Sequence, residues 1–197
     1  MTMINKPSAK NKVKDQKAGS NTAEQKTVAK KKFKRTSEYG RQLEEKQKVK
    51  RLYGMREKQF RNLFGKATRM EGAPGENLLS LLEQRLDNVV YRLKMTISCR
   101  QARQMVVHGH VLVNGKKVTI PSYSVSPGDV ISLNQSSLSK EKFLEVVVDK
   151  RMNIAIKVPE WLELTKQSRT GKMLRYPTRS DIQFPVEEHM IVELYSR

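Results

Sequence analysis

Cysteine is almost absent from this 197-residue sequence, in which Cys99 is the only one. A single thiol can form neither an internal disulfide nor a cysteine cluster for zinc, so we expect a reducing compartment. Histidine is also scarce, and neither His108 nor His110 has a carboxylate or cysteine at metal-ligand spacing. These shortages predict that the chain holds no metal and no other cofactor.

Long apolar runs are missing too. No stretch approaches the ~18 residues of a membrane-spanning helix, and there is no signal-peptide core. Glycine-rich phosphate loops, nucleophile elbows and catalytic groupings of serine, cysteine and histidine are likewise absent. We therefore expect neither a membrane partner nor an enzyme.

Acidic residues are few compared with basic ones. The chain has 39 Lys and Arg against 20 Asp and Glu, which gives a net charge of +19 and a pI of about 10.1. Such a charge suits a polyanion, either nucleic acid or an anionic membrane surface. Because the basic residues are spread along the whole chain and not gathered on one amphipathic helix, nucleic acid is the favoured partner.

The first 36 residues contain hardly any large apolar side chains, and Asp15 and Glu24 are their only acids. Such a segment cannot bury enough surface to order itself, so we expect a disordered basic extension over residues 1–36. One alternative is that it orders on RNA, where Arg35 and the lysines before it neutralise phosphates. Another is an organellar transit peptide, although those segments are typically rich in arginine and this one is rich in lysine.

Two helices are predicted over residues 37–68, with a break near Gly54. The first has almost no apolar stripe, so it is either a solvated helix laced with ion pairs or a helix laid along an RNA backbone and flanked by tyrosines. The second carries Phe60 and Phe64 at helical spacing, which indicates core residues and not base-stacking platforms.

Beyond a glycine and proline cluster at 72–75, apolar residues keep helical period from Leu78 to Leu93 and predict one long core helix. A stiff helix of this length would separate two basic regions, one before it with Arg51 and one after it with Arg100. We expect each region to grip a different arm of one folded RNA.

The stretch from Ser98 to Pro121 carries the strongest local signals. Ser98 can cap a helix while Gln101 reaches back to the serine amide, and the helix should end at His108-Gly109. One face of this helix is apolar, with Ala102, Met105 and Val106. The opposite face presents two guanidinium groups one turn apart, which suits phosphate oxygens; its residues are Arg100, Arg103, Gln104 and Val107.

Two β-rich runs, 110–113 and 116–120, flank Asn114-Gly115, which is a strong signal for a hairpin with a two-residue loop. That register places Val111, Val113, Val118 and Ile120 on one face, and His110, Leu112, Lys117 and Thr119 on the other. Residues 126–129 fit a type II turn that leads into a strand at 130–133 and closes a small sheet.

The remaining segments have weaker patterns. We expect a helix at 140–151, a strand at 161–164 with Trp161 in the core, a loop at 168–179 and a helix within 185–197. The predicted fold class is α+β. It consists of a mainly helical domain, 37–85 plus 149–197, with an inserted module of two helices and a small antiparallel sheet, 86–148.

The order of motifs in this module is similar to that of the S-four RNA-binding domain. The matching segments are 85–93, 98–103, 111–115 and 127–129. The flanks at 39–54, 59–61, 75–79 and 188–197 resemble the small-subunit ribosomal protein S-four family of bacterial type, in a zinc-free form. At the N-terminus the sequence departs from the family, whose members begin with a basic segment punctuated by glycine and proline and with a histidine-containing loop.

This resemblance implies a structural constituent of the small ribosomal subunit. It implies primary binding of small-subunit (16S-type) ribosomal RNA at a helical junction, nucleation of the assembly of the subunit body, and a contact with ribosomal protein S-five that bears on translational accuracy. Other small-subunit proteins and the chain's own messenger RNA are further implied partners. The implied location is a bacterial ribosome in the cytoplasm, with a mitochondrial or plastid ribosome as the alternative.

The candidate RNA-binding residues are basic, aromatic and hydrogen-bonding side chains from the segments described above. They are Arg35, Tyr39, Arg41, Lys46, Lys48, Lys50, Arg51, Tyr53, Arg61, Arg69, Arg92, Arg100, Arg103, Gln104, His108, His110, Lys116, Lys117, Arg175 and Arg179.

Two other classes of protein share the same module. Pseudouridine synthases hold a catalytic aspartate in an Arg-Leu-Asp triplet similar to residues 85–87. Here the triplet lies in the apolar stripe that leads into the module, so we expect Asp87 to bond a nearby amide or arginine instead. A ribosome-associated stress or rescue factor is the other alternative, and the flanking segments favour the ribosomal protein over it.

Overall fold

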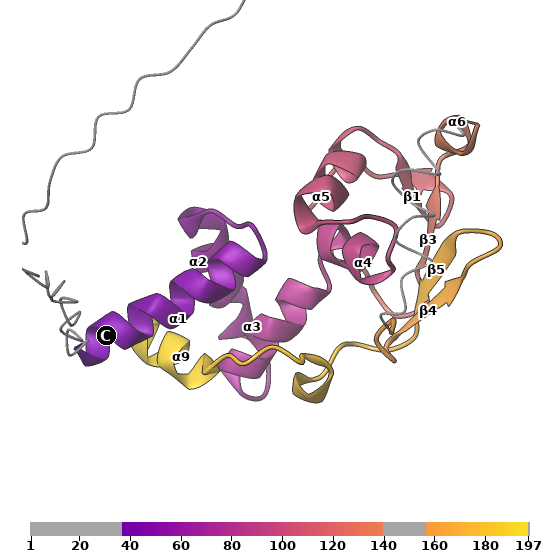
Figure 1. The fold of residues 1–197 in the computed structure, drawn as a ribbon. Coiled ribbons are helices and arrows are strands. Elements are labelled where there is room, and N and C mark those ends of the chain that lie inside the picture. Colours follow the sequence, from indigo (N-terminus) through magenta and orange to yellow (C-terminus); the bar gives the residue numbers. More distant parts are fainter. Residues whose placement is uncertain (1–36, 140–156, 197) are drawn as a thin grey trace, which may run out of the picture. The chain divides into compact units, whose positions relative to one another are not determined.

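The computed structural model describes residues 37–139 and 157–196 (Figure 1). The expected N-terminal extension, with Arg35, and the expected helix at 140–151 lie outside these residues. Helices and an antiparallel sheet make up the described part, so the predicted α+β fold class is confirmed. None of the described helices is both long and apolar enough to cross a membrane.

Two helices open the described part of the chain, as predicted. α1 spans Glu38–Leu52 and begins where the Ser37 Oγ accepts a hydrogen bond of 3.2 Å from the amide of Gly40. It ends before Gly54, whose φ of +59° is one that glycine adopts without strain. α2 spans Glu57–Ala67 and buries both of its phenylalanine rings in the core.

The prediction of one long core helix is wrong, because two helices take its place: α3 (Pro74–Glu83) and α4 (Leu86–Arg92). Between them Arg85 has an extended backbone, with φ −62° and ψ 136°. Backbone hydrogen bonds of 2.8 and 2.9 Å join residues 84 and 86 to the segment 123–125. This pairing stabilises a break that the apolar period, which runs straight across it, does not reveal.

The sheet is larger than expected. Its strands are all antiparallel and follow the order β2-β1-β3-β5-β4; they are β1 (Val111–Val113), β2 (Lys116–Lys117), β3 (Val130–Leu133), β4 (Leu162–Thr165) and β5 (Thr170–Met173). A single-turn helix, α6 (Gln135–Leu138), follows β3.

The expected loop at 168–179 is wrong, since it contains β5 and the start of a short 3-10 helix, η2 (Arg179–Asp181). β5 has no apolar alternation that could have marked it as a strand. Its Gly171 packs on Leu93, and a β-carbon at that position would overlap the leucine side chain. Close packing against α4 therefore fixes a strand that its own residues do not signal.

The predicted hairpin is confirmed. Both residues of the loop 114–115 have positive φ, +52° and +76°, and Val113 pairs with Lys116 across it. The expected place of Ile120 on the core face is wrong: β2 ends at Lys117, and Ile120 is 59% exposed.

The helix predicted after Ser98 also forms, as α5 (Cys99–Val107), and it ends before Gly109, whose φ is +73°. The Ser98 Oγ accepts from the amide of Gln101 at 3.2 Å, as expected. The return bond is different, because the Gln101 Oε1 accepts from the amide of Ile97 at 2.9 Å and not from that of Ser98.

Two apolar clusters form the interior. The helical cluster gathers side chains of α1, α2, α3 and α9 (Glu188–Ser196), and α9 lies beside α1 (Figure 1). The sheet cluster gathers side chains of α4, α5 and the sheet, including Trp161 and Met173. β4 and β5 belong to the same sheet and add Leu162 and Met173 to its core, so residues beyond 148 pack with the predicted module.

Candidate nucleic-acid interface

A concave site of about 440 Å³ lies where the end of α1 meets the starts of α4 and α5. We call it the arginine pocket; its lining residues are Arg51, Leu52, Tyr53, Gly54, Asp87, Asn88, Ser98, Cys99, Arg100 and Arg103. The sequence predicted that Arg51 and Arg100 belong to two basic regions held apart by a stiff helix. That separation is wrong, since both side chains line the same pocket and no continuous helix stands between them.

The cations of the arginine pocket remain available to a ligand. Arg51 and Arg100 are exposed, and neither side chain has a hydrogen-bond or ion-pair partner among the described residues. Arg103 keeps 40% of its side chain exposed while its Nη1 lies 3.5 Å from the Asp87 Oδ2. Guanidinium groups bind phosphate oxygens through paired hydrogen bonds, so this concentration of positive charge suits an RNA backbone.

Asp87 lies buried beneath these arginines. Its carboxylate accepts two hydrogen bonds from Arg85, at 3.0 and 2.7 Å, and one from the amide of Asn88 at 3.0 Å. The contact with Arg103 fills the fourth acceptor position. The expectation that Asp87 bonds a nearby amide or arginine is confirmed, since it bonds both. Because the buried Arg85 balances the charge of Asp87, Arg103 keeps its own net charge for a ligand.

A second buried network supports the pocket from below. Glu83 at the end of α3 accepts hydrogen bonds from the Tyr53 hydroxyl at 2.7 Å, from Asn88 at 2.6 Å and from Arg92 at 2.6 and 3.0 Å. Burial raises the pKa of the Tyr53 hydroxyl above its usual range, and the Glu83 carboxylate raises it further. Tyr53, just after α1, and Arg92, in α4, thus both bind Glu83 at the end of α3, so their polar groups are engaged inside the chain.

Several other candidate cations are paired with acids inside the chain. Lys46 and Lys50 approach Glu57 at 2.8 and 2.9 Å, and their side chains are only 12% and 18% exposed. Hydrogen bonding to Lys46 is the main reason that the pKa of Glu57 falls to about 2. The remaining pairs are Lys48 with Glu45, Arg175 with Asp181 and Arg179 with Glu188.

These pairs also explain how α1 is held without an apolar stripe. Besides the lysines bound to Glu57, Gln42 donates to Glu193 of α9 at 2.9 Å, and the amide of Glu187 donates to Glu45 at 3.3 Å. The interpretation of α1 as a helix laced with ion pairs therefore explains the side of α1 that contacts α2 and α9. Arg41 and Arg51 remain exposed on α1 without a side-chain partner in the described part of the chain.

The exposed face of α5 continues from the arginine pocket to the hairpin. Gln104 and His108 are exposed on it, and Lys116 and Lys117 are exposed on β2. The Lys117 side chain lies so close to Gly109 that a β-carbon there would overlap it, which places this lysine beside the end of α5. The helix face and the hairpin are therefore adjacent, and we call them together the basic surface.

Other candidates lie apart from that surface or have polar partners. His110 is half-buried, and its Nδ1 lies 2.8 Å from the Ser137 Oγ. Tyr39 is 53% exposed near the start of α1, and Arg61 and Arg69 are exposed on or just after α2. No group of three or more His, Cys, Asp or Glu side chains is arranged for a metal ion in the described ranges.

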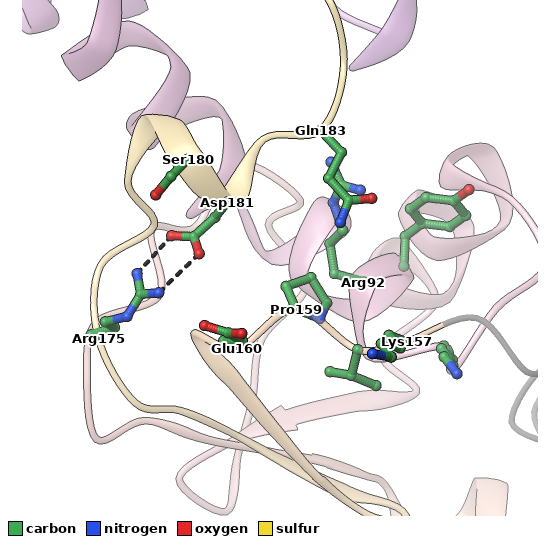
Figure 2. A pocket seen from close by; sticks show the side chains of 11 residues that line it. Arg92, Lys157, Pro159, Glu160, Arg175, Ser180, Asp181 and Gln183 are labelled. Atoms are coloured by element: carbon green, nitrogen blue, oxygen red, sulfur yellow. Dashed lines mark hydrogen bonds and ion pairs between the residues drawn. The ribbon is translucent and has the colours of Figure 1, made fainter.

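A second pocket, of about 540 Å³, lies beside the chain segment between β5 and α9. Figure 2 shows Arg175 and Asp181 joined across one side of it, with Glu160 nearby. Arg92 also lines this pocket but is bound to Glu83. Because both arginines are neutralised by carboxylates, this pocket is a poorer site for phosphate than the arginine pocket.

Fold and site together define an α+β protein with two apolar cores and an arginine-lined pocket between the end of α1 and the starts of α4 and α5. Comparison with known families gives a match to the S4 domain at residues 84–131 and to the ribosomal protein S4/S9 N-terminal domain at residues 4–83. The second match includes the N-terminal segment, where the sequence departs from the glycine- and proline-punctuated pattern expected of the family.

Curated relatives agree with these matches. The chain is 55% identical over 161 residues to the small ribosomal subunit protein uS4 of Halothermothrix orenii. The aligned segment covers 82% of this chain and 76% of the relative. It is 52% identical over 164 residues to the uS4 proteins of Thermoanaerobacter sp. and Clostridioides difficile, with 83% and 77% covered in each comparison. The chain belongs to the uS4 family of small ribosomal subunit proteins. Membership in this family agrees with the prediction that the chain is not an enzyme.

Proposed function

We propose that this chain is a structural protein of the small ribosomal subunit and that it binds the ribosomal RNA of that subunit. The interface consists of the arginine pocket and the basic surface that continues over α5 and the hairpin. The observation that carries this proposal is the set of exposed guanidinium groups of Arg51, Arg100 and Arg103 in one pocket, on a chain of the uS4 family. Arg51 and Arg100 have no side-chain partner among the described residues, and Arg103 keeps 40% of its side chain exposed, so all three can exchange counterions for RNA phosphates.

The proposed partner follows from the relatives. They are named small ribosomal subunit proteins, and they come from bacteria, which favours a bacterial ribosome in the cytoplasm over an organellar one. The finer roles that we propose are primary binding at a helical junction of the RNA, nucleation of the subunit body, and a contact with ribosomal protein S5 that affects accuracy. Repression of the chain's own messenger RNA would use the same basic surface.

Two alternative functions are set aside. A pseudouridine synthase would need Asp87 free for chemistry, whereas all four acceptor positions of this carboxylate are occupied. A stress or rescue factor with an S4 domain would not account for the match of residues 4–83 to the ribosomal S4/S9 N-terminal domain.

The test is co-sedimentation of the tagged chain with ribosomal subunits in an extract of the cells that naturally produce it. We expect the chain to migrate with the small subunit, to be absent from the separated large subunit, and to stay bound through a wash in moderate salt. Migration only with free protein would contradict the proposal, and equal amounts on both subunits would replace it with unspecific binding to RNA.

A further inference from the structure

The arginine pocket is more than a set of charges on a flat surface. Its volume of about 440 Å³ falls within the ~300–1,000 Å³ of sites that hold small organic ligands. A phosphate group on the outside of a helix needs only a shallow contact, whereas a hollow of this volume also has room for a base.

The walls of the pocket include apolar surface. Leu52 lines the pocket and is 40% exposed. Gly54 also lines it and leaves open space, because no atom lies within 4 Å of where its β-carbon would be. Cys99 lines the same pocket and is half-buried. An exposed aliphatic wall beside guanidinium groups matches a ligand that is apolar on one side and anionic on the other.

The Asn88 side chain offers an acceptor in the pocket wall. Asp87 has no acceptor position left, as described above. Asn88 donates from Nδ2 to Glu83, and its Oδ1 has no donor among the described residues. A ligand with an amino group could supply that donor.

We propose that the arginine pocket receives one unpaired nucleotide of the RNA, with its phosphate on the guanidinium groups of Arg51, Arg100 and Arg103 and its base against Leu52. This inference rests on the proposed function, because it specifies what the same surface binds. The bases of a duplex are paired and stacked, so only a bulged or flipped base can enter a concave site. The Asn88 Oδ1 then accepts from an amino group of the base.

The experiment compares three RNAs with the full-length chain: an unbroken hairpin, the same hairpin with one bulged nucleotide, and the bulged hairpin with an abasic residue at the bulge. We expect the bulged hairpin to bind about tenfold more tightly than the other two, because only this RNA removes a base and the Leu52 side chain from water. Leu52→Ser should reduce the affinity for the bulged hairpin to that of the abasic hairpin measured with the same variant. Met70→Ser is the matched control, since Met70 is 43% exposed and lies outside the pocket.

The single thiol supplies an independent readout. Because Cys99 lines the pocket, the bulged hairpin should slow its modification by a small thiol reagent several-fold, and the abasic hairpin should not. Equal affinity for the three RNAs, or equal thiol reactivity in their presence, would overturn the nucleotide site while leaving the phosphate interface standing. Protection of Cys99 by poly-glutamate to the same extent would also overturn it, in favour of an acidic protein segment. Failure to bind any of the RNAs would overturn the proposed function itself.

Discussion

Asp87 and Arg103 belong to successive helices, α4 and α5, and the carboxylate Oδ2 lies 3.5 Å from the guanidinium Nη1. The carboxylate is fixed from its other side by the bidentate hydrogen bonds of the buried Arg85. The Arg85–Asp87 pair is neutral overall and is fixed by these hydrogen bonds. It therefore orients the exposed Arg103 without cancelling the charge of this arginine. We regard Asp87 as a positioning residue for the RNA interface.

Replacing Asp87 by asparagine should weaken both the fold and the interface. The change leaves the buried Arg85 without a counter-charge, so we expect the free energy of unfolding in urea to fall by about 3 kcal/mol. Glu71→Gln is the control, because Glu71 is exposed and its side chain has no partner in the described residues; it should change stability by less than about 0.5 kcal/mol. If Asp87→Asn matches this control, the buried pair does not form as described.

The pairing of Glu57 with Lys46 and Lys50 predicts acid sensitivity of the helical cluster. The folded-state pKa of Glu57 is lowered from 4.5 to about 2, so its stabilising contribution is complete above pH 4.5 and is lost as the pH falls toward 2. In Glu57→Gln that part of the dependence should be missing, and melting temperatures of variant and parent should converge as the pH falls. A constant difference between the two proteins from pH 7 to pH 2 would contradict the pairing.

Two glycines with equally open surroundings isolate the effect of backbone conformation. Neither Gly115 nor Gly65 has an atom within 4 Å of an added β-carbon, but only Gly115 has a positive φ, of +76°. Gly115→Val should therefore lower stability by about 1 to 3 kcal/mol, because a β-branched residue is strained there. Gly65→Ala, inside α2, should raise stability by about 0.5 to 1 kcal/mol. Equal effects of the two changes in urea unfolding would mean that the hairpin turn is not type I′.

Local signals in the sequence predicted the local parts of the fold. The cap at Ser98, the loop Asn114-Gly115 and the two helices around Gly54 each depend on residues within a few positions of one another, and each forms. The break at Arg85 depends on Ser124, which lies 39 residues further along the chain. The strand β5 depends on the contact of Gly171 with the distant Leu93. Such pairing leaves no periodic trace in either segment.

The candidate site divides in the same way. The basic face of α5 follows from helical spacing, so Arg100 and Arg103 could be named together from the sequence. Whether a cation is free or paired depends on where the acids lie after folding, and Glu57 and Glu83 occupy several of the cations that composition alone suggested. The meeting of Arg51 with Arg100 in one pocket is a product of tertiary packing and could not be predicted from spacing.

The central claim is that RNA is held by the arginine pocket and not by positive charge in general. It is tested most directly by titrating small-subunit ribosomal RNA with two double variants that lose the same charge, Arg100→Ala with Arg103→Ala and Arg61→Ala with Arg69→Ala. The pocket variant should lose about 3 kcal/mol of binding free energy, if each charge-assisted contact contributes ~1.5 kcal/mol, and its log-log salt slope should fall by about 2. The α2 variant, whose arginines are exposed outside the pocket, should bind within a few-fold of the parent. Equal losses for the two variants would contradict the account.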